Sequence, residues 1–142
     1  MTALRVGALL ALLSFPFALA DAGDPGARIP ILCLLLGVPH LLALFTTTRN
    51  APKAIGFAGG SACIFMVGFT FDFVLSLIEL FPVSGKPWPW MTGAMTHLVL
   101  LAAAIDAGRR TNASRKEVGR FALWGVAYSI VSIVAVQVVA KI

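Results

Sequence analysis

The sequence predicts an all-α integral membrane protein, a four-helix transmembrane bundle plus an N-terminal fifth span or signal peptide. Of its 142 residues, 59% are hydrophobic and 12% are charged, whereas soluble domains are about 25% charged. The apolar residues form five long runs, and a helix needs about 20 such residues to cross the hydrocarbon of a bilayer. The basic residues lie mainly in the connectors between these runs.

The first run, Val6–Ala20, has two interpretations that the sequence leaves open. Arg5 precedes it, and Ala18-Leu19-Ala20 closes it before Asp21, which is the pattern of a secretory signal peptide. Cleavage after Ala20 would leave four spans with both ends of the chain outside. A retained run would form a fifth span whose N-terminus lies inside.

The four following runs predict the spans of the bundle. Turn-forming glycine and proline and charged side chains separate them, as expected of non-helical connectors. Because the connectors are short, we expect a single transmembrane helical domain, 1–142, without a soluble part. The expected spans are about 29–46, 54–81, 90–107 and 119–140.

The basic residues predict the orientation of these spans. Eight of the eleven Lys and Arg side chains lie at Arg5 or in the loops 46–53 and 106–120, and positive residues are retained in the cytoplasm. These loops are therefore expected inside and the C-terminus outside, in a bacterial cytoplasmic membrane. This topology explains the net charge of +5, and without a nucleic-acid-binding motif we expect no nucleic-acid partner.

Two carboxylates interrupt the run 54–81. Asp72 and Glu79 are seven residues apart, nearly two helical turns, so they share one face of the helix. Glu79 lies only about 3–5 Å below the outer boundary and can reach the head groups. Asp72 lies about 14 Å deep, where a carboxylate costs a few kcal/mol or more and marks a candidate functional site.

Further polar side chains fall at similar depths in the other spans. His40 lies about 15 Å deep, His97 about 10 Å and Ser132 about 12 Å. Their neighbours on each helix face are small or polar, which favours close packing inside the bundle. We therefore expect a shared pocket in the outer half. The candidates for ligand binding or proton exchange are Asp72, His97, His40, Ser76, Glu79, Tyr128 and Ser132.

Several roles for these residues remain open. Buried histidines can simply hold helices together, and His40 can bond to the backbone carbonyl that Pro39 leaves without a donor. Alternatively, Asp72 with His97 or His40 forms a protonatable site, or both histidines ligate a b-type haem. A lipid or quinone head group near Tyr128 is a further alternative, whereas no metal site is expected.

The sequence offers no signature of nucleophilic catalysis and no phosphate-binding glycine loop. We therefore expect a non-enzymatic accessory or scaffolding subunit, with the lipid bilayer and a membrane protein or a second copy of the chain as partners. The alternatives are a transporter-like or ligand-binding bundle and a haem electron carrier. The Gly56-x-x-x-Gly60 spacing predicts close helix packing within the chain, and Cys33 and Cys63 are expected to remain unpaired.

Overall fold

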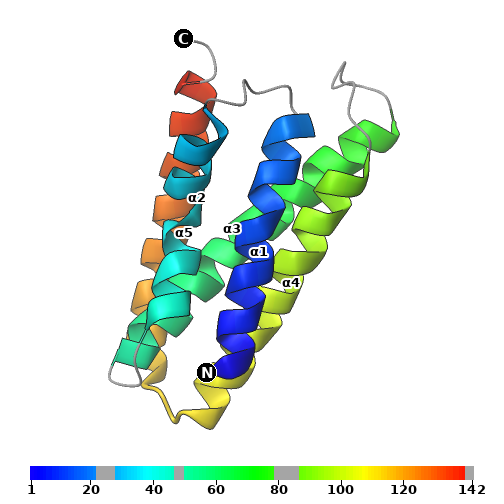
Figure 1. The fold of residues 1–142 in the computed structure, drawn as a ribbon. Helices are drawn as coiled ribbons and strands as arrows, with labels where there is room; N and C mark the ends of the chain where they lie inside the picture. Colours follow the sequence, from blue (N-terminus) through cyan, green and yellow to red (C-terminus); the bar gives the residue numbers. More distant parts are fainter. Residues whose placement is uncertain (22–27, 47–49, 79–86, 140–142) are drawn as a thin grey trace.

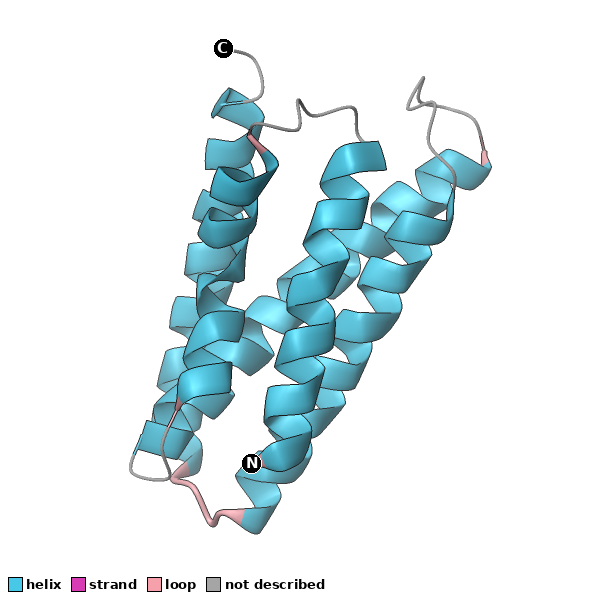
Figure 2. Ribbon diagram, in the orientation of Figure 1, coloured by secondary structure: helices cyan, strands magenta, loops and turns pink. Residues whose placement is uncertain are grey.

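The computed structural model describes residues 1–21, 28–46, 50–78 and 87–139, and the described chain is helical apart from short turns (Figure 2). This result confirms the all-α prediction. The five helices, labelled in Figure 1, are α1 (Thr2–Asp21), α2 (Ile29–Phe45), α3 (Ala51–Leu77), α4 (Pro87–Arg110) and α5 (Arg115–Val139).

The helices form one bundle, and α1 is packed into it along one face. Helix α1 packs on α2 and α4, while α3 packs on α4 and α5 and crosses behind α1 (Figure 1). Helix α2 makes lighter contacts with α3 and α5. We call the end that holds Met1 and the α4–α5 turn the lower end, and the end where α1 finishes and α4 begins the upper end.

Four helices are long and apolar enough to cross a membrane, namely α1, α3, α4 and α5. Helix α2 is shorter, with 17 residues, which corresponds to about 25 Å at 1.5 Å per residue. The N-terminal apolar run, which forms α1, is therefore one of the four helices long enough to cross a membrane. Pro30 and Pro52 lie in the first turns of α2 and α3, where a missing backbone N–H costs nothing.

Helix α1 contributes to both apolar clusters of the core. Leu4, Ala8 and Ala11 are fully buried in the lower cluster, which is rich in alanine. Phe15 is 2% exposed and lies in the upper cluster, which is rich in larger side chains. Small residues let helices approach closely, so the alanines of the lower cluster favour close packing of α1 at that end.

Glycine residues allow the backbones of α3 and α5 to approach each other closely. A side chain at Gly60 would clash with the carbonyl oxygen of Ala122, and one at Gly125 would clash with that of Phe57. The predicted intramolecular packing of the Gly56-x-x-x-Gly60 segment is thereby confirmed. The two thiols, Cys33 and Cys63, are both free, as predicted.

The burial of α1 yields a prediction about the mature protein. Removing residues 1–20 would take Leu4, Ala8, Ala11 and Phe15 out of the core and leave their neighbours uncovered. We therefore expect α1 to be retained, with an intact mass near 15.0 kDa for the protein purified from a membrane fraction. A mass lower by the first 20 residues would contradict this prediction.

Candidate functional site

The two histidines of the chain meet in the centre of the bundle. His40 on α2 and His97 on α4 are both 0% exposed. Their Nε2 atoms are 3.1 Å apart, which is hydrogen-bond distance. The structure thus brings together two residues that the sequence placed on different helices at comparable depth, and joins α2 directly to α4.

The hydrogen bonds around the pair assign its protons when both rings are neutral. Nδ1 of His97 lies 2.8 Å from the carbonyl oxygen of Gly93, which can only accept, so this nitrogen carries the proton. Nε2 of His97 must then accept from Nε2 of His40. Nδ1 of His40 is left unprotonated, and it has no hydrogen-bond partner among the described residues.

Aromatic rings surround the histidine pair and exclude water from it. Phe15 meets both imidazoles nearly edge-on, with ring centroids 5.3 Å from His40 and 5.4 Å from His97. Phe65 lies 5.9 and 5.4 Å from the same two rings, and Phe69 lies 5.2 Å from His97. These contacts come from α1 and α3, so four helices meet at the histidine pair.

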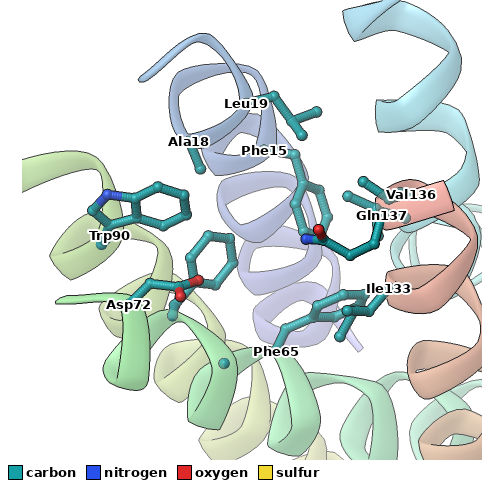
Figure 3. A pocket seen from close by; sticks show the side chains of 12 residues that line it. Phe15, Ala18, Leu19, Phe65, Asp72, Trp90, Ile133, Val136 and Gln137 are labelled. Atoms are coloured by element: carbon teal, nitrogen blue, oxygen red, sulfur yellow. The ribbon is translucent and has the colours of Figure 1, made fainter. Parts of the chain in front are cut away.

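Above these rings lies a cavity of about 290 Å³, which we call the upper cavity (Figure 3). Asp72 on α3 lies on one side of it with Trp90 on α4, and Gln137 reaches in from α5 on the other side. These two polar side chains are exposed at the cavity mouth. The ten other lining residues are apolar or glycine: Phe15, Ala18, Leu19, Leu36, Phe65, Gly68, Phe69, Trp90, Ile133 and Val136.

Asp72 does not join the histidines. Phe15, Phe65 and Phe69 line the upper cavity and also contact the imidazole rings, so they separate the carboxylate from the pair. No hydrogen bond or ion pair links Asp72 to His40 or His97 in the described part of the chain. This separation corrects the expectation of a single polar pocket, because Asp72 lies nearer the upper end of the bundle than the histidines, on the other side of the phenylalanine layer.

The carbonyl that Pro39 leaves free has a different partner from the one expected. Proline has no N–H, so the carbonyl of Leu35, four residues earlier, loses its helical donor. The hydroxyl of Tyr128 on α5 donates to this oxygen at 2.6 Å. His40 instead bonds to His97, and the expectation that it satisfies the proline carbonyl is therefore corrected.

The remaining predicted residues have local roles. The hydroxyl of Ser76 donates to the carbonyl of Phe73 within α3 at 2.7 Å. Ser132 is 1% exposed and donates to the carbonyl of Ser129, whose own hydroxyl bonds to that of Ser61 across the α3–α5 contact. Glu79 lies outside the described residues. Sequence reasoning missed Gln137, whose only signal is that it interrupts an apolar run.

The geometry of the pair also bears on haem or metal ligation. Two axial haem ligands, each about 2.0 Å from the iron on opposite sides, have nitrogens about 4 Å apart, which exceeds the 3.1 Å between the two Nε2 atoms. Phe15 and Phe65 pack against both imidazoles, where a haem ring would need a slot. The described residues hold no group of three or more His, Cys, Asp or Glu suited to a metal.

No protein-family model, curated protein or solved structure matches this chain. A fold by itself does not fix a function, which resides in the chemistry of a site. The histidine pair and the upper cavity are therefore the features from which a function can be argued.

The histidine pair predicts a non-additive pattern of stability. His40→Leu and His97→Leu should each lower the free energy of unfolding by about 2 kcal/mol, because the remaining imidazole stays buried without a partner. The double variant should lose less than the sum of the two. Denaturant unfolding of the four proteins in detergent micelles measures this coupling. Strictly additive losses would mean that the pair does not interact.

The Tyr128 hydrogen bond can be tested against the proline that creates its acceptor. Tyr128→Phe should lower the free energy of unfolding by about 1 kcal/mol, because the Leu35 carbonyl loses its donor. In a Pro39→Ala background the restored backbone N–H can bond to that carbonyl, so the same substitution should cost clearly less. Equal costs in both backgrounds, measured by unfolding in micelles, would refute the assigned role.

Proposed function

We propose that this chain is a multi-pass membrane protein that binds an apolar ligand with an oxygen-bearing head group in the upper cavity. The observation that carries the proposal is the composition of that cavity. Ten of its twelve lining residues are apolar or glycine, and the two polar ones, Asp72 and Gln137, lie at its mouth. Ligand sites are typically apolar concavities with a few placed polar groups, of about 300–1,000 Å³.

The outward surface of the bundle supports the membrane part of the proposal. Large apolar side chains are exposed on all five helices, for example Phe17 at 66%, Phe45 at 79% and Leu123 at 72%. Continuous exposed apolar surface is unusual in a soluble monomer and suits lipid. The basic loops 46–53 and 106–120 favour a cytoplasmic lower end and an outer upper end, in a bacterial cytoplasmic membrane.

The walls of the cavity define the class of ligand. Phe69 and Trp90 offer flat aromatic faces, and Ile133 offers a branched aliphatic one. The Gln137 amide can both donate and accept a hydrogen bond, and the Asp72 carboxyl accepts, or donates when protonated. A quinone-type or lipid head group with carbonyl or hydroxyl oxygens matches this set.

The histidine pair supports this function indirectly. It fixes α2 against α4 below the aromatic rings that form the cavity floor. A transporter-like mechanism with protons exchanged between Asp72 and His97 or His40 would have to cross that apolar layer, so the geometry favours binding over translocation. A ligand-binding bundle is compatible with an accessory or scaffolding subunit that has a membrane-protein partner or a second copy of the chain.

Ligand binding can be measured by quenching of tryptophan fluorescence with a short-chain prenylated benzoquinone, because Trp90 lines the cavity. Gly68→Leu should abolish quenching at low quinone concentration, since a side chain at Gly68 enters open space beside the cavity. Gln137→Leu should weaken binding about tenfold through a lost hydrogen bond.

Two matched controls accompany this experiment. Gly119→Leu also adds a side chain in open space but far from the cavity lining, and Ser76→Ala removes a hydroxyl that bonds within its own helix. Both should bind the quinone as the parent does. Quenching that persists unchanged in Gly68→Leu would show that the quinone does not occupy the upper cavity.

A further inference from the structure

A second concavity lies at the lower end of the bundle, opposite the upper cavity. This lower groove has a volume of about 720 Å³ between α2, α3 and α5. It exists because α2 packs chiefly on α1 and only lightly on α3 and α5. Its lining residues are Val38, Leu41, Leu42, Phe45, Thr46, Asn50, Lys53, Ala54, Phe57, Phe121 and Trp124.

The basic side chains of Lys53 and Arg120 both contact the aromatic ring of Phe121, which lines this groove. Nζ of Lys53 lies 5.8 Å from the centroid of the Phe121 ring, and Cζ of Arg120 lies 5.3 Å from the same centroid. Both side chains are exposed. In the described part of the chain neither of these two cations forms an ion pair with a carboxylate.

We propose that the lower groove binds one anionic phospholipid, with its phosphate between Lys53 and Arg120. An acyl chain would lie along the apolar wall that Leu42 and Phe57 form with their neighbours. Asn50 adds an amide that can bond to an ester or head-group oxygen. This site is separate from the upper cavity and takes a different class of ligand, so it extends the proposed function.

Charge complementarity selects the anionic lipid over a zwitterionic one. A phosphate near two uncompensated cations gains from both, and each Lys or Arg near an anionic lipid surface contributes about 1 kcal/mol to the attraction, or about fivefold in affinity. A choline or ethanolamine group would bring a third positive charge to the same place. The apolar wall in turn favours a lipid over a free phosphate ion, because the ion has no apolar surface to bury against it.

Thermal unfolding of the full chain in micelles, with phosphatidylglycerol or phosphatidylcholine of identical acyl chains, tests the proposal. Phosphatidylglycerol should raise the Tm more than phosphatidylcholine and show saturable binding. The double variant Lys53→Gln with Arg120→Gln should weaken phosphatidylglycerol binding about 30-fold. Arg109→Gln with Arg115→Gln removes the same charge from the same end of the bundle but outside the groove, and should bind as the parent does.

A third variant separates a groove from a diffuse surface charge. Leu42 is 51% exposed and lines the groove, so Leu42→Trp should fill it and reduce phosphatidylglycerol binding with every cation in place. Loss of binding in both the Lys53/Arg120 variant and Leu42→Trp supports the site. The proposal would be overturned if the two lipids raised the Tm equally, or if the two charge variants lost phosphatidylglycerol binding equally. It would also be overturned if Leu42→Trp left binding unchanged, or if inorganic phosphate raised the Tm as much as phosphatidylglycerol does.

Discussion

The hydrogen bond between His40 and His97 is the constraint on which the rest of the bundle depends. Two fully buried imidazoles cannot exchange hydrogen bonds with water, so losing the bond between them leaves a buried polar group unpaired at a cost of about 2 kcal/mol. The pair therefore fixes the rotation and height of α2 against α4. Phe15 packs on both rings, so the position of α1 depends on the same bond.

A second side-chain hydrogen bond joins α2 to α5. Pro39 frees the Leu35 carbonyl, and the hydroxyl of Tyr128 satisfies it. Helix α2 is thus positioned by one side-chain bond to α4, one to α5 and its packing on α1. Because α2 packs chiefly on α1 and only lightly on α3 and α5, the lower groove opens between α2, α3 and α5. Two specific polar contacts thus position the side of α2 that faces away from α1.

The helical content followed from the sequence because its cause is local. Five apolar runs of sufficient length, separated by turn-forming residues, leave helices as the natural way to satisfy the backbone in an apolar setting. The ends of the helices were less predictable. Helix α4 begins at Pro87 and α5 at Arg115, several residues before the expected apolar limits of 90 and 119. Pro87 and Pro89 fit the first turn of α4, where backbone N–H groups have no partner within the helix. In α5 the charged residues that precede the apolar run simply continue the helix.

The sequence by itself determined the helical class and the tight Gly56–Gly60 segment, since these depend on composition and spacing. Only the tertiary structure decided which faces turn inward. It paired His40 with His97 and left Asp72 at the mouth of the upper cavity, beyond three phenylalanine rings. It also paired Tyr128 with Leu35, 93 positions apart. Composition and spacing are local properties, whereas rotation of a helix about its axis is set by packing against partners distant in the chain.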